Sequence, residues 1–214
     1  MWFYIKWTFL ILFWGLIGAT LHYTLPQHDI ARITDAYPKR VDFGENWLFY
    51  SHAGSGDAEG VTNRDVFFIA AILKNGKPME YRNEDTAWSW PPYFKFDTAS
   101  VQTEAADLKS GADNPKWVVI RHYGWRSNLY SIYPNALSVR QVEGPDVRII
   151  PWFNIVFLTI FFAIIYAIWV RWRRFRRARI DPMVEDLNES LEAASDSMAE
   201  KRGRFRRWID SWRG

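Results

Sequence analysis

The chain has 214 residues, a formal net charge of +3 and no cysteine. The absence of cysteine excludes disulfides, thiolate catalysis, haem attachment through a cysteine pair and cysteine zinc sites. The charge is segregated, because residues 26–148 hold 16 acidic and 14 basic side chains whereas residues 171–214 hold 8 acidic and 12 basic. A basic excess in the C-terminal part favours contact with anionic lipid headgroups over nucleic acid.

An apolar segment opens the chain. Residues 7–21 are apolar apart from two threonines, and Lys6 precedes them. We expect a transmembrane helix within residues 1–24. A cleaved signal peptide is the alternative, although no small-residue cleavage motif follows. A face for close helix packing is predicted at Gly15, Gly18 and Ala19, although glycine is also common in membrane helices for other reasons.

Residues 25–149 predict one strand-rich domain with a single helix. The clearest signal is a hairpin over residues 65–82, because Asn75-Gly76 supplies the two positive-φ positions of a tight turn. The other expected elements are strands over residues 32–43, broken at Tyr37-Pro38, 116–123 and 129–142, and a helix over residues 100–109 capped by Ser100. This order predicts an α+β fold, and a small five-stranded barrel of the oligomer-binding type is compatible with it.

A second apolar segment follows the domain. Residues 152–170 carry no charge, and nineteen helical residues span about the hydrocarbon thickness of a bilayer. We expect a transmembrane helix over residues 150–171. The basic run after it is Arg171, Arg173, Arg174, Arg176, Arg177 and Arg179. By the positive-inside rule this run and Lys6 place both termini in the cytoplasm, which makes the middle domain periplasmic.

Residues 172–214 predict an amphipathic cytoplasmic tail. Asp181-Pro182 has the form of a helix start, and apolar residues then recur every three or four positions among acidic ones up to Glu200. Such a helix is complementary to the arginine run or to a basic partner. A second helix, lying flat at the lipid headgroups, is predicted from Phe205, Trp208, Ile209 and Trp212, with a disordered basic tail as the alternative.

Few residues carry a signal for chemistry. The four histidines lack metal-ligand spacing, and neither a nucleophile-elbow motif nor a phosphate-binding glycine loop occurs. We therefore predict no catalytic residue, metal or cofactor. His22 and His28, with Asp29 adjacent, are a weaker candidate for binding a metal or a proton than for an interfacial structural role.

The strongest candidate surface for a ligand or partner combines aromatic and charged side chains. Pro91 and Pro92 stiffen the loop that carries several of these side chains. The two carboxylates, Glu84 and Asp85, are adjacent in sequence, which does not provide the separation between acid and base that a glycosidase needs. The same aromatic residues could instead build the core, which is the more common use in a small domain. The surface is predicted from Arg82, Glu84, Asp85, Trp88, Trp90, Tyr93, Trp125 and Arg126.

Several segments resemble a family of alphaproteobacterial membrane proteins known only as a domain of unknown function. The resemblance extends over about residues 6–158. It is carried by Leu21-His-Tyr-Thr-Leu-Pro-Gln-His-Asp-Ile30, Tyr81-Arg-Asn-Glu-Asp-Thr86, Trp90-Pro-Pro-Tyr-Phe-Lys-Phe-Asp97, His122-Tyr-Gly-Trp-Arg126 and Pro145-Asp-Val-Arg-Ile-Ile-Pro-Trp-Phe-Asn154. It implies an exported domain held by flanking spans in a bacterial inner membrane, and it brings no activity or cofactor.

These patterns favour a non-enzymatic accessory, assembly or scaffold protein of the inner membrane. Its spans, periplasmic domain and tail would associate with a larger membrane protein complex and with anionic headgroups. A transmembrane sensor that binds a ligand near Trp90 is the alternative, and a small envelope hydrolase that depends on Glu84 or Asp85 is a weaker one.

Overall fold

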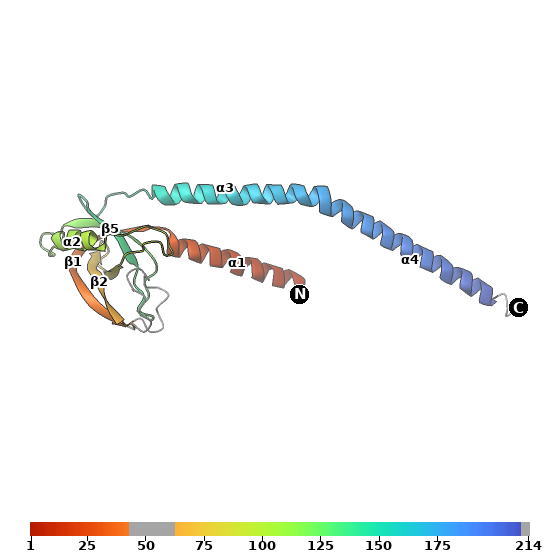
Figure 1. The fold of residues 1–214 in the computed structure, drawn as a ribbon, viewed down its shortest axis with the longest axis horizontal. Coiled ribbons are helices and arrows are strands. Elements are labelled where there is room, and N and C mark those ends of the chain that lie inside the picture. The colour runs from red at the N-terminus through yellow and green to blue at the C-terminus, as the bar shows by residue number, and fades with distance from the viewer. Residues whose placement is uncertain (43–62, 211–214) are drawn as a thin grey trace. The chain divides into compact units, whose positions relative to one another are not determined.

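The structure is a computed structural model, and it describes residues 1–42 and 63–210. The chain divides into two compact units, residues 1–154 and 155–214. The first unit contains the N-terminal helix and a barrel, and the second is helical (Figure 1).

Helix α1 (Trp2–Thr24) is apolar along its length and has no buried residue. It ends because Leu25 precedes Pro26, and the residue before a proline is sterically disfavoured in the helical region. Leu25 is accordingly extended, with φ −71° and ψ 138°, while its N–H still donates to the carbonyl of Leu21. The helix passes directly into the first strand (Figure 1).

Five strands close into a barrel in the order β1-β2-β3-β5-β4. Helix α2 (Thr98–Asp107) connects β3 to β4. The strands are β1 (Gln27–Asp42), β2 (Asn63–Leu73), β3 (Pro78–Asn83), β4 (Trp117–Tyr123) and β5 (Asn135–Gln141). A five-stranded barrel with this order and one helix between the third and fourth strands has the topology of the oligomer-binding fold. The α+β class and the small barrel are therefore confirmed.

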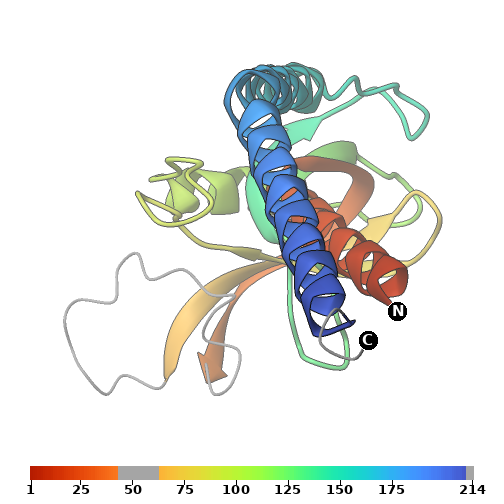
Figure 2. The same ribbon diagram turned by 90° about the vertical axis from the view of Figure 1, so that its right-hand side faces the viewer.

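The long strand β1 contributes to two sides of the barrel. Its first part pairs with β4, starting at Gln27 opposite His122, and its later part pairs with β2 as far as Asp42 opposite Asn63. The far ends of β1 and β2 run out together beyond β3 (Figure 2). The barrel closes between β3 and β5, which are parallel and share one paired position, Arg82 with Asn135.

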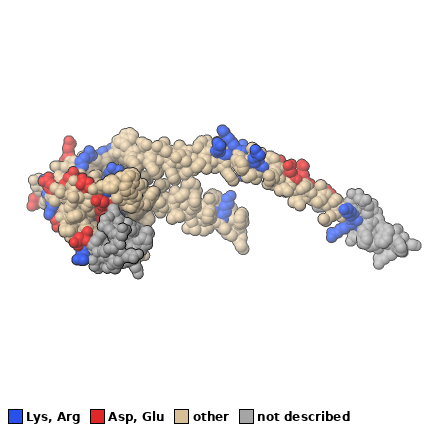
Figure 3. Space-filling model, in the orientation of Figure 1, with Lys and Arg blue, Asp and Glu red and all other residues tan. Residues whose placement is uncertain are grey.

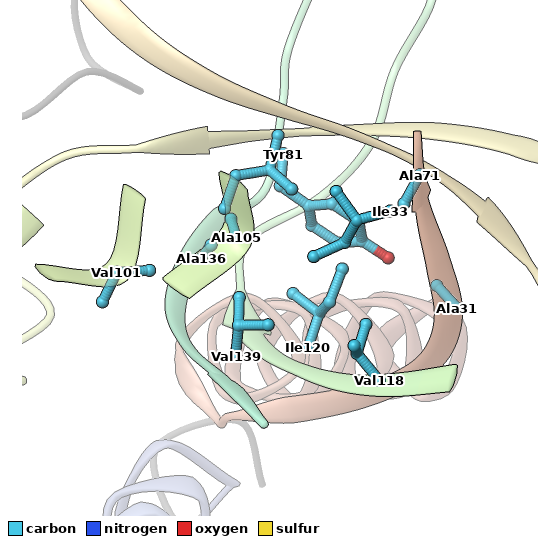
Figure 4. Close-up of a cluster of buried hydrophobic side chains, with 11 residues drawn as sticks. Ala31, Ile33, Ala71, Tyr81, Val101, Ala105, Val118, Ile120, Ala136 and Val139 are labelled. Atoms are coloured by element: carbon cyan, nitrogen blue, oxygen red, sulfur yellow. The ribbon is translucent and has the colours of Figure 1, made fainter. Parts of the chain in front are cut away.

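The barrel interior is packed with apolar side chains from all five strands and from α2. Tyr81, Ile33 and Ile120 point toward one another from three different strands (Figure 4). Val101 and Ala105 are the buried positions of α2, spaced four residues apart on one helix face. The barrel is thus filled with side chains and sealed by α2 at one side.

Three predicted boundaries were wrong. Strand β1 is continuous through Pro38, which pairs with Phe67. The N-cap of α2 is Asp97, whose side chain accepts from the N–H of Ser100, so the helix begins before the predicted capping serine. Strand β5 begins at Asn135 and not at Leu129, because residues 124–134 form a loop that Pro134 ends.

The second unit is one long helical stretch. Helix α3 (Trp152–Phe175) passes through a π-helical turn, η2 (Arg176–Ile180), into α4 (Asp181–Asp210). Helix α4 begins at Asp181, as predicted, but Asp181 has helical φ and ψ and continues η2 without a break, so its predicted role as a helix cap was wrong. Two helices of the described residues, α1 and the one beginning at Trp152, are long and apolar enough to cross a membrane.

Candidate functional site: the junction of helix α1 and the barrel

Tyr23, near the C-terminal end of α1, packs against the loop that follows β4. Its ring lies edge-on to Trp125 at 5.3 Å and to Tyr123 at 6.2 Å between centroids. Its carbonyl accepts a hydrogen bond of 2.9 Å from the N–H of Gly124. Gly124 has φ +96°, and a Cβ there would lie 3.7 Å from the Tyr23 ring and 3.5 Å from the Cα of Pro134. These distances are ordinary van der Waals contacts, so it is the positive φ that favours glycine at this position.

Two further side chains bind the same end of α1. The hydroxyl of Tyr93, from the loop after β3, donates to the carbonyl of Thr24. The indole N–H of Trp125 donates to Nδ1 of His22 at 3.0 Å. Tyr93 also stacks on Tyr123 at 5.0 Å, and burial raises the pKa of its hydroxyl. We call Tyr23, Tyr93, Tyr123 and Trp125 the junction aromatics.

A buried ion pair lies near the junction. Arg82 and Glu84 are 2.7 Å apart, and their side chains are only 4% and 6% exposed. The side chain of Asn135 accepts from the Glu84 N–H and donates to the Glu84 carbonyl and to the hydroxyl of Tyr123. These hydrogen bonds of the Asn135 side chain reinforce the single paired position that joins β3 to β5. Paired and hydrogen-bonded charges are the form in which a protein interior tolerates ions.

Lys95 is a second buried charge at this layer. Its ammonium group donates to Oδ1 of Asn83 and, at 2.8 Å, to the carbonyl of Ala136. Burial lowers the pKa of Lys95 from 10.5 to about 8, although Asp85 and Glu84 nearby oppose that shift. The sequence pattern gave no sign of this residue, since a lysine after Tyr93-Phe94 is normally a solvent-exposed loop residue.

The predicted surface of eight residues is divided by the structure. Asp85 accepts from the N–H and hydroxyl of Thr98 at 2.9 and 2.7 Å, so it holds the start of α2. Arg126 lies over the Tyr133 ring at 4.3 Å and donates to the carbonyls of Ser127 and Ile132. Tyr93 and Trp125 are brought together at α1. Trp88 and Trp90 stay exposed, at 81% and 72%.

Another polar cluster lies inside the barrel next to the start of β1. Oδ2 of Asp29 accepts from the Tyr81 hydroxyl at 2.6 Å and lies 3.0 Å from Nε2 of His122. Burial alone would raise the pKa of Asp29, but His122 and Tyr81 outweigh it and hold that pKa below its usual value.

The sequence pattern did not predict the Asp29 cluster, because it placed Asp29 with His22 and His28. A signal existed, because Asp29 shares the strand parity of Ala31 and Ile33, which face inward. Next to the cluster is a pocket of about 300 Å³ lined in part by His28, Asp29 and Lys74. The described residues contain no group of three or more potential metal ligands.

The remaining predicted residues lie on the helices. An added Cβ at Gly15 or Gly18 would meet no described atom within 4 Å, and Ala19 is half-buried. Arg171, Arg173, Arg174, Arg176 and Arg177 are all exposed. Arg173 lies over the Trp169 ring at 4.7 Å, and Arg176 lies 3.5 Å from Asp181. The basic run and the acidic stretch after it are visible in Figure 3. The side chains of Phe205, Trp208 and Ile209, and the whole of Trp212, lie outside the described part.

Residues 3–176 match a family model described as a protein of unknown function, DUF1523. The chain belongs to this family. One relative is an uncharacterised protein of Haemophilus influenzae, which is 40% identical over 158 residues that cover 72% of this chain and 86% of the relative. No solved structure matches the chain. The expected membership in a family of unknown function is thereby confirmed.

Proposed function

We propose that this DUF1523 protein is a non-enzymatic accessory or scaffold subunit of a membrane protein complex in a bacterial inner membrane. In this proposal α1 and α3 cross the membrane, both termini are cytoplasmic and the barrel is periplasmic. Lys6 and the arginine run after α3 support that orientation, because basic residues at the ends of spans are retained in the cytoplasm.

The observation that carries the proposal is the junction between α1 and the barrel. Three hydrogen bonds and the junction aromatics bind the last turn of α1 to two separate loops. Such a connection fixes the height and orientation of the barrel above the membrane, which a positioning subunit requires. Glu84 and Asp85, the carboxylates that a hydrolase would need, are engaged in binding Arg82 and in holding α2.

Two surfaces suit protein partners. The small-residue face of α1 at Gly15, Gly18 and Ala19 would let a second helix approach closely within the membrane. On α4, Val184, Leu187 and Leu191 are exposed along one stripe with acidic residues around it. An exposed apolar stripe on a helix suits docking into a groove of a partner.

The test is purification of the tagged full chain in mild detergent, with quantification of the membrane proteins that copurify. A stoichiometric partner is expected. A Gly15→Ile, Gly18→Ile variant should lose it, because β-branched side chains block close helix approach, whereas Ile17→Leu on another face of α1 should retain it. Purification of the unaltered chain as a clean monomer would contradict the proposal.

A transmembrane sensor is the second candidate, and the pocket beside the Asp29 cluster favours it. The pocket of about 300 Å³ offers His28, Asp29 and Lys74 to a small polar ligand. A sensor should transmit a change at the pocket to α4. Lys74→Glu should then alter hydrogen-exchange protection in α4, measured on the full chain in nanodiscs. Unchanged protection would eliminate the sensor.

A further inference from the structure

Two loops of the barrel expose large apolar side chains. The loop after β3 presents Trp88 and Trp90, and the loop after β4 presents Leu129, which is 84% exposed, and Tyr130. Large apolar side chains that two loops of a small domain both leave exposed mark candidate interaction surfaces. We call these four side chains the loop apolars.

Both loops are uncharged where the loop apolars lie. Residues 86–94 and 127–134 contain no acidic or basic side chain. The charged residues next to these segments are directed elsewhere, because Lys95 is buried in the barrel and Arg126 lies over Tyr133. The loops therefore offer apolar and aromatic side chains with no charged side chain among them.

Both loops are also tied to the end of α1. Tyr93 binds the carbonyl of Thr24, and Trp90 is three residues from Tyr93, so their Cα atoms lie within about 10 Å of each other. Trp125 binds His22 on the last turn of α1. Ser127 and Ile132 then pair in an isolated β-bridge, and Leu129 and Tyr130 lie at the tip of the loop between them.

The end of α1 sets the depth of these loops. Its 23 residues extend about 35 Å at 1.5 Å per residue, slightly more than the roughly 30 Å of hydrocarbon. If α1 crosses the membrane, His22 and Thr24 lie among the headgroups, and side chains bonded to them lie at the same level. Tryptophan and tyrosine are favoured at that depth, because their rings are apolar and their N–H and O–H groups can bind water.

We propose that the loop apolars insert into the headgroup layer of the outer leaflet and dock the barrel onto the phospholipid surface. The occupant of this surface is lipid, because the loops reach the membrane level set by α1 and lack charge. The inference rests on the proposed crossing of the membrane by α1. In this proposal the two loops add lipid contacts to the anchoring by α1, so that the barrel resists tilting relative to the membrane.

The test uses the full chain in nanodiscs of phosphatidylethanolamine and phosphatidylglycerol. Because the chain has no cysteine, a single one can carry an environment-sensitive fluorophore. The positions are Trp90→Cys and Leu129→Cys, with Glu104→Cys on the exposed face of α2 as the matched control. Quenching is measured with lipids spin-labelled near the headgroup and with iodide in the water.

Lipid-borne quenching at positions 90 and 129 is expected to exceed that at position 104 at least twofold, with iodide quenching in the opposite order. Equal lipid-borne quenching at positions 90, 129 and 104 would overturn the proposal. The same result is expected if a protein or a glycan, and not lipid, binds these loops. Leu16→Cys tests α1 separately, because a spin label deep in the acyl chains quenches it only if α1 spans the bilayer. Failure at Leu16 refutes the membrane crossing, and failure at the loops alone refutes only lipid docking.

Discussion

Arg82 and Glu84 form an ion pair that is almost completely removed from water. Truncation of one partner leaves a buried charge without compensation, which typically destabilises a protein by about 3–5 kcal/mol. We therefore expect Glu84→Leu to lower the free energy of unfolding of the barrel by about that amount. Urea unfolding of the detergent-solubilised full chain, followed by near-ultraviolet circular dichroism, measures the change.

The paired variant Arg82→Met, Glu84→Leu provides the control. Replacement of both charges by apolar groups of similar size is often close to neutral, so the double variant should be more stable than Glu84→Leu alone. If the two single changes simply add, the ion pair does not couple these residues and its assignment as a stabilising unit is wrong.

The lowered pKa of Lys95 should make the free energy of unfolding increase with pH in the alkaline range. Its pKa is about 8 in the folded chain against 10.5 for the ordinary group, because burial disfavours the charge. Between these values the unfolded chain binds a proton that the folded chain has released, so stability rises with pH. We expect a gain on the order of 2 kcal/mol from pH 8 to pH 10.

The measurement is a series of urea unfolding curves across that range, compared with Lys95→Met. The variant should lack the rise, since it carries no titrating group at that position. Buried tyrosines such as Tyr81 and Tyr93, whose pKa values are raised by burial, lower stability in both proteins as the pH approaches and passes 10. The contribution of Lys95 is therefore the difference between the two profiles. A difference that stays constant between pH 8 and pH 10 would show that Lys95 is not held with a lowered pKa.

At the scale of elements, the backbone conformation of Gly124 supports the junction, because its N–H donates to the carbonyl of Tyr23. Any other L-residue would be strained at φ +96°, whereas its Cβ would make only ordinary contacts with Tyr23 and Pro134. Gly124→Ala is expected to cost about 1–3 kcal/mol and, by disfavouring this conformation, to loosen the junction. Thermal unfolding and limited proteolysis between α1 and β1 report the two effects.

Gly144→Ala is the matched control, because a Cβ at Gly144 meets no described atom within 4 Å. It should leave the unfolding temperature unchanged within about one degree. Equal destabilisation by both variants would mean that the cost at Gly124 is general to loop glycines and has no relation to the junction.

Elements governed by local rules were predictable from the sequence. The hairpin of β2 and β3 was predicted correctly, and it turns at Gly76 with φ +79°. The expected second positive φ, at Asn75, was wrong, because the Gly76 N–H instead closes the turn onto the carbonyl of Leu73. Tertiary pairing and helix continuity explain the other errors. Pro38 stays within β1 because β2 pairs along the whole segment, and Asp181 is not a helix cap because α3 continues through η2 into α4. Periodicity cannot report whether a neighbouring segment extends a strand or a helix across such a residue.

The junction was only partly predictable. The residues Tyr93 and Trp125 were singled out, because exposed aromatic residues near charges suggest a surface. Their common partner, the last turn of α1, was not foreseen, since it is about seventy to one hundred residues away in the sequence. Lys95 and His122 were missed for the same reason: burial of a charged residue depends on which strands close the barrel.

At the scale of the whole molecule, the proposed membrane crossing of the two apolar helices predicts on which side of the membrane the barrel and α4 lie. The chain has no cysteine, so single substitutions report exposure to a membrane-impermeant maleimide without background. In intact spheroplasts Asp113→Cys, in an exposed loop of the barrel, should be labelled. Asn188→Cys, on α4, should be labelled only after permeabilisation.

Labelling of Asn188→Cys from outside would contradict the proposed orientation. Loss of residues 1–24 from the mature chain, detectable by mass spectrometry, would favour the signal-peptide alternative. The first result would reverse the proposed placement of the tail. The second would remove α1, and with it the junction that connects α1 to the barrel.

The place where the barrel closes is also the place where α1 docks. β3 and β5 share a single paired position, and Asn135 at that position neighbours Gly124, against which Tyr23 packs. If α1 crosses the membrane as proposed, it is synthesised and inserted before β5 emerges, so the last seam of the barrel forms on an anchor that already exists. In that case a barrel separated from α1 should open first at this seam.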